Sequence, residues 1–303
     1  MNKVHEVYDA AIVGAGPAGL SAALTLVRSL RSVAVFDAPT PPRNAASPGI
    51  GGLLGREMVA PSDLKTTAMA ELDGYGGARF VTQSVASVER DTGGGFVIVA
   101  EDGTTTRAAR ILLACGMVDR FPSIDGLQDY WGTSVIYCPF CHGFELRGGR
   151  WGVFVNRATM TDVAEIYLTW TNDLMLFLEP DIPLDADRQA ALANKGIAVE
   201  HRRVTRLRGD GSGLEAIELE DGTLIDRTAL VLWPMQAQTA LVTALGPELD
   251  GDGYVVVDDG YRTSIDRLYA IGDLLYAGHQ NVNTAIHMGA LAAATMVLDR
   301  AIG

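Results

Sequence analysis

The chain has 303 residues, of which 48% are hydrophobic and 20% are charged, so it has room for about two domains and buries ample core without disulfide staples. It carries 24 Lys and Arg residues against 37 Asp and Glu residues, and this formal charge of −13 disfavours nucleic acid and anionic membrane surfaces as partners. Three cysteines are too few for a structural disulfide framework, no apolar run approaches the ~18 residues of a membrane span, and the polar start of the chain lacks a secretory segment, so we expect a cytoplasmic protein.

The first elements in chain order form a strand, a glycine turn and a helix. An apolar run over residues 7–13 predicts a buried strand, the turn Gly14-Ala-Gly16-Pro-Ala-Gly19 follows it, and apolar periodicity over residues 20–30 predicts a helix. Gly14 permits the tight turn, Gly16 lets the backbone approach a pyrophosphate, and Gly19 permits close packing of the helix. This spacing favours a dinucleotide-binding turn over a glycine-rich turn in an unrelated α/β protein.

The next strand supplies the acid that such a turn requires. Residues 33–36 predict a short buried strand that ends at Asp37, eighteen residues after Gly19. A βαβ dinucleotide fold places an acid about 20 residues after its last glycine, where the carboxylate accepts a hydrogen bond from a ribose hydroxyl. Strand, turn, helix and acid together predict that the first half of the chain binds a dinucleotide.

An internal echo divides the chain into two similar halves. Residues 96–116 and residues 214–234 each predict a hairpin around the turn Glu-Asp-Gly-Thr, followed by a buried strand. The second half accordingly opens with a predicted strand over residues 151–155, a turn, and a predicted helix over residues 163–170, with the next strand at residues 174–178. Both halves are therefore expected to share a nucleotide-binding architecture.

The turn of the second half contains no glycine. It includes Asn156, Arg157 and Ala158, and a β-carbon at each position blocks the approach of the backbone to a pyrophosphate. Glu179, after the next strand, offers an acid where a 2′-phosphate would need arginine. The basic run at residues 201–203 lies one strand too late to replace that arginine and is interpreted as a solvated strand end. The second half is therefore predicted to have lost its nucleotide.

The C-terminal stretch returns to the first half. A strand over residues 268–273 ends in Gly272-Asp273, and a helix rich in small residues follows over residues 284–298. The Asp273 carboxylate can accept a hydrogen bond from a ribityl hydroxyl, and the helix N-terminus can stabilise negative charge on a reduced isoalloxazine ring. The two chain ends are thus predicted to build one discontinuous domain.

This reasoning gives a two-domain division of the chain. Residues 1–117 and 239–303 are predicted to form an FAD-binding domain, and residues 118–238 to form an inserted, degenerate NADPH-type domain. The expected fold class is α/β, with two Rossmann-like nucleotide-binding domains.

The motif that carries the chemistry is Cys138-Pro-Phe-Cys141-His142-Gly. A Cys-x-x-Cys-His run also attaches c-type haem, but that requires export, and zinc requires two further ligands at suitable spacing, so no metal site is predicted. A redox-active dithiol is favoured because two intervening residues let the sulfurs bond and the loop can lower one thiol pKa. Cys115 ends an apolar strand and is interpreted as a small buried thiol. His142 is either an acid–base group or a residue that orients the loop, and His279 is a second candidate base.

These residues carry a resemblance to a known family. The whole chain is similar to the thioredoxin-reductase-like flavoproteins, in which an FAD domain is split around an inserted domain that bears Cys-x-x-Cys. The run Cys138-Pro-Phe-Cys141-His-Gly-Phe-Glu, with Pro42-Arg-Asn-Ala and Gly52-Leu-Leu-Gly-Arg-Glu, further resembles the flavin-dependent dithiol oxidases that close disulfides in gliotoxin, holomycin and romidepsin-type natural products. The resemblance implies FAD as cofactor, a small-molecule dithiol and O₂ as partners in place of NADPH, and a homodimer.

The same resemblance implies roles for individual residues. Cys138 is the interchange thiol and Cys141 the thiol that faces the flavin, whereas His142 stands where thioredoxin reductases have an acid. The residues expected to bind FAD are Gly14, Gly16, Pro17, Ala18, Gly19, Asp37, Ala38, Asn44, Gly272, Asp273, Gln280, Asn281 and Val282. Two competing interpretations stay open: a reductase that moves electrons from NADPH or ferredoxin through FAD to a protein disulfide, and a flavin-bound redox sensor without turnover.

Overall fold

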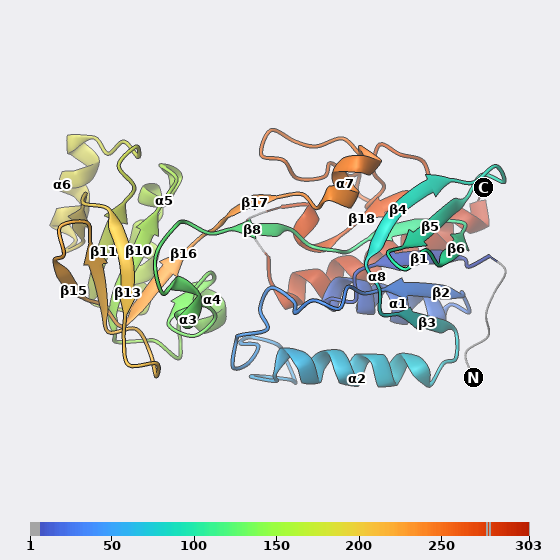
Figure 1. The fold of residues 1–303 in the computed structure, drawn as a ribbon, viewed down its shortest axis with the longest axis horizontal. Coiled ribbons are helices and arrows are strands. Elements are labelled where there is room, and N and C mark those ends of the chain that lie inside the picture. Colours follow the sequence, from blue (N-terminus) through green and yellow to red (C-terminus); the bar gives the residue numbers. More distant parts are fainter. Residues whose placement is uncertain (1–6, 277, 279, 303) are drawn as a thin grey trace. The chain divides into compact units, whose positions relative to one another are not determined.

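The computed structural model describes residues 7–276, 278 and 280–302, which fold into two compact units. The first unit comprises the described parts of Met1–Pro42, Pro61–Asp119 and Gln236–Gly303, and the second comprises Arg43–Ala60 and Arg120–Met235. Each unit contains a five-stranded parallel sheet and a separate three-stranded antiparallel sheet (Figure 1). The expected α/β fold class with two Rossmann-like halves is confirmed.

One segment lies in a different unit from the one that the sequence suggested. Residues 43–60 fall inside the predicted FAD-binding domain, yet they pack with the second unit. The contacts of this segment include close backbone approaches at two glycines. A β-carbon on Gly51 would lie 1.9 Å from the Cys141 carbonyl oxygen, and one on Gly132 would lie 3.1 Å from the Ser47 nitrogen. Such long-range contacts leave no periodic signal in the sequence.

The first unit is built on a buried parallel sheet. In sheet order its strands are β18 (Leu268–Ala270), β7 (Ile111–Leu113), β1 (Ala10–Val13), β2 (Val33–Phe36) and β3 (Ala78–Val81). Every residue of β1, β2, β7 and β18 is buried, as expected for parallel strands covered on both faces. Helix α1 (Pro17–Arg28) packs against α8 (Val282–Ile302) and α2 (Pro61–Asp73).

The antiparallel sheets contain the two hairpins that the internal echo predicted. The strands are β4 (Val85–Arg90), β5 (Phe96–Ala100) and β6 (Thr105–Ala108) in the first unit, and β13 (Val204–Arg208), β14 (Ala216–Leu219) and β15 (Leu224–Asp226) in the second. The turns that join β5 to β6 and β14 to β15 use Gly103 and Gly222, each at a φ of +83°. Only glycine adopts this left-handed conformation without strain, which explains the repeated Glu-Asp-Gly-Thr run.

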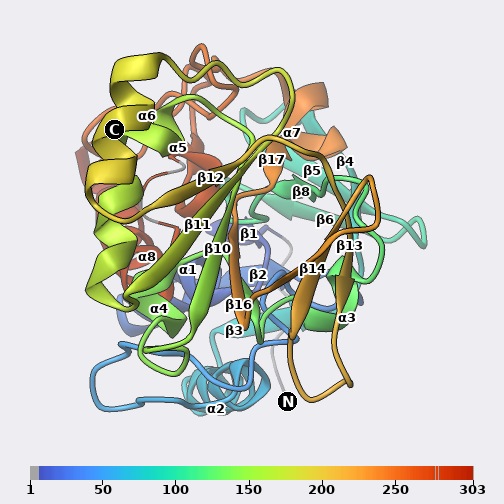
Figure 2. The ribbon, with the colours of Figure 1, turned by 90° about the vertical axis from the view of Figure 1, so that its left-hand side faces the viewer.

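The second unit repeats the parallel architecture. In sheet order its strands are β12 (Ala198–Glu200), β11 (Asp173–Leu178), β10 (Arg150–Val155), β16 (Ala229–Leu232) and β9 (Val135–Ile136). Figure 2 shows the neighbouring strands β10 and β11 of this sheet, and helix α6 (Ala186–Asn194) precedes β12 along the chain. Asp185 caps α6 because its side chain accepts a hydrogen bond from the Arg188 N–H.

The predicted helix over residues 163–170 differs from the one in the structure. A single α-helical turn, α5 (Thr159–Asp162), is followed by the 3₁₀ helix η1 (Ala164–Thr169). No side chain caps either segment, and β-branched threonine and valine residues lose rotamer freedom in a helix. The second unit therefore lacks the long crossover helix that α1 provides in the first.

Two short strands, β8 (Val118–Arg120) and β17 (Met235–Ala237), pair where the chain passes between the units. The remaining short helices are α3 (Leu127–Tyr130), α4 (Pro139–His142), α7 (Ala240–Leu245) and the 3₁₀ helix η2 (Gly272–Leu274). Within the described part of the chain, no helix combines the length and the apolar character needed to cross a membrane.

Candidate nucleotide-binding turn and redox site

The glycine turn between β1 and α1 has the geometry of a phosphate-binding turn. Gly14 has a φ of +109°, and a β-carbon there would lie 2.3 Å from the Ala114 carbonyl oxygen. A β-carbon on Gly19 would lie 1.9 Å from the Gly14 carbonyl oxygen, whereas one on Gly16 would meet nothing within 4 Å. Gly14 and Gly19 are therefore required by close packing, and Gly16 keeps open space beside the backbone, where a diphosphate can approach.

The start of α1 leaves backbone donors available beside this space. Gly16 is the N-cap, Pro17 occupies the first turn, no side chain caps the helix, and the first turn carries no acid. The N–H groups at a helix start have no partner within the helix, and together with the helix dipole they bind anionic groups. A diphosphate therefore fits this turn.

Asp37 lies at the end of β2 beside the same turn, as the sequence predicted. Its Oδ1 accepts a hydrogen bond from the Ala15 N–H at 3.0 Å, and its Oδ2 pairs with the ammonium group of Lys65 on α2. Each carboxylate oxygen keeps a further lone pair that can accept from a ribose hydroxyl. Lys65 was not predicted from the sequence, because it belongs to no motif and lies 28 residues away from Asp37.

Residues from the C-terminal stretch lie beside the start of α1. Gly272 has a φ of +73°, and a β-carbon there would lie 3.3 Å from the Ala18 side chain. Asn281 caps α8, which begins at Val282, because its Oδ1 accepts a hydrogen bond from the Thr284 N–H at 3.0 Å. The chain ends thus meet in one unit, as the discontinuous domain requires.

Gln236 in β17 holds Gln280 by two reciprocal hydrogen bonds. The Gln236 amide nitrogen donates to Gln280 Oε1 at 2.9 Å and to Asp119 Oδ1 at 2.9 Å. Its amide oxygen accepts from Gln280 Nε2 at 2.8 Å and from the Tyr254 hydroxyl at 2.9 Å. All four hydrogen-bonding positions of the Gln236 side chain are used, so Gln236 fixes the orientation of a residue predicted to bind FAD. Gln236 belongs to no motif that could have singled it out.

The second unit carries the cysteine pair as a disulfide. Cys138 and Cys141 are bonded, with their Cα atoms 5.3 Å apart. Cys138 has an extended backbone and caps α4, and Pro139 occupies the first helical position, where its missing N–H costs no helical hydrogen bond. The Cys141 and His142 N–H groups both donate to the Cys138 carbonyl oxygen at 3.2 Å. A redox-active pair requires two sulfurs close enough to bond, and Cys138 and Cys141 meet this requirement.

An aromatic column lies beside the disulfide. Phe140, between the two cysteines, is 72% exposed, and its ring meets the edge of Trp170 at 5.3 Å between centroids. Trp170 in turn stacks on the fully buried Trp151 at 6.1 Å. The exposed Phe140 ring in the disulfide turn is therefore connected through Trp170 to the core of the second unit.

His142 contacts the segment formed by residues 43–60. Its Nε2 lies 3.4 Å from the hydroxyl oxygen of Ser47, a buried residue that also donates to the Gly49 carbonyl oxygen at 2.7 Å. Desolvation lowers the pKa of His142, and the charge of Glu145 opposes this shift. The imidazole is therefore neutral at pH 7 and can accept a proton there.

Comparison with known proteins places this arrangement in a family. The family model described as pyridine nucleotide-disulphide oxidoreductase matches residues 8–161 and 171–289. The chain belongs to this family. Its members are typically flavoproteins, and membership makes the chain an oxidoreductase. The resemblance to thioredoxin-reductase-like flavoproteins is thereby confirmed.

Individual family members match over nearly the whole length. Thioredoxin reductase sirT from Leptosphaeria maculans is 30% identical over 284 residues, which are 88% of this chain and 86% of that protein. The crystal structure of HlmI matches with a TM-score of 0.90 and 31% identity, covering 100% of this chain and 96% of that one. An oxidoreductase from Agrobacterium tumefaciens matches with a TM-score of 0.89 and 29% identity, covering 98% and 99%.

In the second unit, two side chains of the turn after β10 bond to a neighbouring segment of the backbone. The Asn156 side chain donates to the Trp233 carbonyl oxygen at 2.8 Å, and the Arg157 guanidinium donates to the Pro234 carbonyl oxygen at 3.0 Å. Both side chains thus bridge the turn to the segment after β16. The following α5 is a single turn, too short to supply a helix dipole to a phosphate. These contacts fit the predicted loss of nucleotide binding.

In the basic run at residues 201–203, the Arg202 side chain is paired with acids, and residues 201 and 203 are exposed. The Arg202 guanidinium forms ion pairs with Glu200 at 2.7 Å and with Asp221 at 2.8 Å, and these hydrogen bonds raise its pKa further. The arginine side chain therefore has its charge compensated at the end of β12. The structure favours the interpretation of this run as a solvated strand end.

The predicted FAD-binding residues fall in two places. All of them except Asn44 belong to the first unit, whereas Asn44 lies exposed in the segment of residues 43–60. Ala38 is half-buried after Asp37. His279, the second candidate base, lies outside the described residues. The redox residues Cys138, Cys141 and His142 come together in the second unit.

Cys115 belongs to the first unit, whereas the disulfide belongs to the second. Its sulfur is 3.8 Å from the Thr239 hydroxyl oxygen, and desolvation raises the pKa of its thiol. A thiol with a raised pKa stays protonated near neutral pH and reacts slowly. The interpretation of Cys115 as a packing residue fits this environment.

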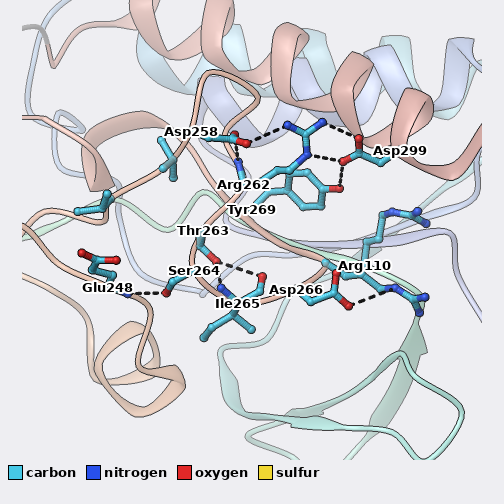
Figure 3. A pocket seen from close by; sticks show the side chains of 13 residues that line it. Arg110, Glu248, Asp258, Arg262, Thr263, Ser264, Ile265, Asp266, Tyr269 and Asp299 are labelled. Atoms are coloured by element: carbon cyan, nitrogen blue, oxygen red, sulfur yellow. Dashed lines mark hydrogen bonds and ion pairs between the residues drawn. The ribbon is translucent and has the colours of Figure 1, made fainter. Parts of the chain in front are cut away.

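A cavity of about 950 Å³ lies in the first unit, and none of the predicted site residues is among those that line it. Figure 3 shows Arg262 between two of the acidic side chains that line it, Asp258 and Asp299. Arg262 bonds to Asp258 at 3.0 Å and to both oxygens of Asp299, which also accepts from the Tyr269 hydroxyl. Arg262, Asp258 and Asp299 therefore compensate one another's charges within this lining.

Proposed function

We propose that this chain is an FAD-dependent dithiol oxidase, which closes an intramolecular disulfide in a small-molecule dithiol and delivers the electrons to O₂, giving H₂O₂. The overall reaction balances as one dithiol plus one O₂ giving one cyclic disulfide plus one H₂O₂. The proposal rests on family membership, on the Cys138–Cys141 disulfide and on the contrast between the two nucleotide turns.

The contrast between the turns is the observation that carries the proposal. The first unit keeps a glycine turn with open space at Gly16 and uncapped donors at the start of α1. In the second unit, Asn156 and Arg157 occupy the corresponding turn and bond to backbone carbonyls. A chain that holds one dinucleotide and excludes a pyridine nucleotide must obtain its electrons from another donor, and we propose that the substrate thiols are that donor.

FAD fits the first unit on three observations. The open space at Gly16 accommodates the diphosphate, the Asp37 carboxylate accepts from the ribose, and Gln280 is fixed by Gln236 beside the start of α8. When bound, FAD supplies a two-electron acceptor that can be reoxidised by O₂. The residues of the chain supply the binding, the thiol exchange and the proton transfer.

Thiol exchange at the disulfide proceeds in two displacements. A substrate thiolate attacks Cys138 Sγ, which breaks the Cys138–Cys141 bond, forms a mixed disulfide and releases Cys141 as a thiolate. The second substrate thiolate then attacks the substrate sulfur of the mixed disulfide and releases Cys138. The substrate has then lost two electrons and two protons, and the enzyme holds two reduced cysteines.

His142 and Phe140 prepare the site for this exchange. The neutral His142 imidazole, with its pKa lowered by desolvation, accepts the proton of the attacking substrate thiol. Phe140, which lies between the cysteines in sequence and contacts Trp170, offers an exposed apolar surface on the same helical turn. Deprotonation of the substrate thiol by His142 and apolar contact with Phe140 would both favour the reaction of a small dithiol at Cys138.

An oxygen electrode and an anaerobic spectrum test the proposal together. Adding a small dithiol to the yellow holoenzyme in air should cause continuous O₂ uptake, and adding NADPH without air should leave the flavin absorbance at its oxidised value. The variant Cys141→Ser keeps the flavin but lacks the disulfide, so its O₂ uptake should fall to the background rate. Bleaching by NADPH would overturn the proposal.

A second candidate is a reductase of protein disulfides that receives electrons from NADPH or ferredoxin. The names of relatives favour it, since sirT is described as a thioredoxin reductase. The bonded turn after β10 opposes NADPH as the donor. Rapid anaerobic flavin reduction by reduced ferredoxin, without dithiol-dependent O₂ uptake, would support this candidate instead.

A further inference from the structure

Ser47 is a buried hydroxyl held against the redox turn by a segment from the first half of the sequence. Its side chain is 7% exposed. The hydroxyl oxygen lies 2.7 Å from the Gly49 carbonyl oxygen and 3.4 Å from His142 Nε2. No motif in the sequence connects Ser47 with a histidine 95 residues later.

Counting protons assigns the direction of both hydrogen bonds. A serine hydroxyl has one proton to donate, and a carbonyl oxygen can only accept. At 2.7 Å from the Gly49 oxygen, the Ser47 proton must lie between these two oxygens, since two bare oxygens at that distance would repel each other. Ser47 is then an acceptor towards His142, and Nε2 of the neutral imidazole must carry the proton.

We propose that Ser47 is a positioning residue that holds His142 as the Nε2–H tautomer, so that Nδ1 is the atom that accepts the proton of the attacking thiol. This inference rests on the proposed function, in which a substrate thiol opens the Cys138–Cys141 disulfide. It deepens that function by naming the atom that takes the proton and the residue that selects it.

The backbone around Ser47 explains why its hydroxyl stays in place. A β-carbon on Gly49 would lie 2.7 Å from the Met58 carbonyl oxygen, and one on Gly132 would lie 3.1 Å from the Ser47 nitrogen. The Ser47 N–H also donates to the Asn44 carbonyl oxygen at 3.0 Å. Ser47 is thus fixed from both sides, and its oxygen has little freedom to turn away from His142.

The electrostatic surroundings of His142 are simple. Glu145, on the same turn, is the charged group that acts on the imidazole among the described residues, and it favours the protonated ring. The segment of residues 43–60 contributes the neutral Ser47 hydroxyl. Loss of Ser47 therefore changes a hydrogen bond and leaves the local charge unchanged.

The tautomer can be measured directly on the oxidised holoenzyme. Multiple-bond ¹H–¹⁵N correlation spectra distinguish a protonated from a bare imidazole nitrogen, and His142→Gln identifies the signals of His142 among five histidines. We expect a protonated Nε2 and a bare Nδ1 above the pKa of the ring. A wild-type spectrum with the proton on Nδ1 would overturn the inference, whatever the behaviour of any variant.

A pH profile separates positioning from a general structural role. The reaction measured is the anaerobic opening of the Cys138–Cys141 disulfide by dithiothreitol in stopped flow. In Ser47→Ala we expect the rate near pH 7 to fall about tenfold, a loss typical of residues that orient a reacting group. The defect should disappear above the pKa of the attacking thiol, because an ionised thiol needs no base.

Two further variants control this experiment. Ser47→Thr keeps a hydroxyl and should restore the rate near pH 7. Ser134→Ala removes another buried serine of the same unit, whose hydroxyl accepts from the Leu214 N–H at 3.1 Å, and should leave the pH profile unchanged. A rate reduced equally at every pH in Ser47→Ala, or reduced alike in Ser134→Ala, would mean that Ser47 acts only through folding.

The same measurements keep the two proposals apart. Disulfide opening by dithiothreitol and the tautomer spectrum involve no O₂, whereas the proposed oxidase function is tested by O₂ uptake. If O₂ uptake is absent while the pH signature holds, the positioning role of Ser47 stands and the oxidase function fails. If O₂ uptake is present and the pH signature is missing, the oxidase function stands and the positioning role of Ser47 fails.

Discussion

The contact between Gly51 and the redox turn gives the sharpest structural prediction. In Gly51→Ala the new β-carbon would lie 1.9 Å from the Cys141 carbonyl oxygen, whereas ordinary contact begins at 3.4 Å. The segment and the redox turn must therefore separate by about 1.5 Å. The neighbouring atom belongs to the backbone, so no side chain can rotate away to relieve the collision.

This displacement sets the size of the expected losses in stability and in the rate of disulfide opening. Overpacking of this kind costs about 1–3 kcal/mol of stability, which corresponds to a fall in Tm of about 2–4 °C per kcal/mol for a chain of this class. A misplacement of about 1 Å near reacting atoms costs up to about 100-fold in rate. We therefore expect Gly51→Ala to slow the opening of the Cys138–Cys141 disulfide by dithiothreitol about 10- to 100-fold.

Gly55→Ala provides the matched control. Gly55 lies in the same segment at a φ of +79°, and a β-carbon there would meet nothing within 4 Å. This variant strains the backbone by about 1–2 kcal/mol without touching Cys141. Stopped-flow disulfide exchange and thermal melting should thus show a rate defect in Gly51→Ala alone. Equal exchange rates in the two variants would refute the idea that this segment positions the redox turn.

The remaining predictions concern the sulfurs, the glutamine network and acid stability. Cys138→Ser should leave Cys141 as a lone thiolate and give a long-wavelength charge-transfer absorbance with bound flavin; the same band in Cys141→Ser alone would reverse the assigned roles. Gln236→Leu removes four hydrogen bonds, so FAD affinity measured by dialysis should fall several-fold, and unchanged affinity would contradict a positioning role. The hydrogen-bonded guanidinium of Arg188 lowers the pKa of Glu165 from 4.5 to about 2. The stability lost in Glu165→Gln, measured by urea unfolding, should therefore be constant above pH ~5 and shrink as the pH falls towards 2, and a loss independent of pH would count against this ion pair.

Local motifs were sufficient to predict the parts of the site that are close in sequence. The glycine turn, the strand that ends at Asp37 and the Cys138–Cys141 pair each depend on spacings of fewer than about 25 residues, for which strand and helix periodicity is a direct guide. The hairpins with Gly103 and Gly222 were predictable for the same reason, since a left-handed turn position favours glycine.

Residues that act through long-range contacts could not be predicted in this way. Ser47, Lys65 and Gln236 reach His142, Asp37 and Gln280 across 95, 28 and 44 residues respectively, and each is an ordinary polar residue without a motif. The prediction of a helix over residues 163–170 was inaccurate for a different reason. Its apolar periodicity suits a helix of either kind, and the structure shows the tighter 3₁₀ form.

The packing of residues 43–60 with the second unit has a consequence for engineering. A fragment cut from Arg120 to Met235 would contain both cysteines but would lack Ser47 and Gly51, which contact the redox turn from outside that stretch. Grafting this dithiol onto another scaffold therefore requires two non-contiguous pieces of chain. A chimaera of two relatives that exchanges only the stretch equivalent to residues 120–235 would combine the redox turn of one parent with the segment equivalent to residues 43–60 of the other.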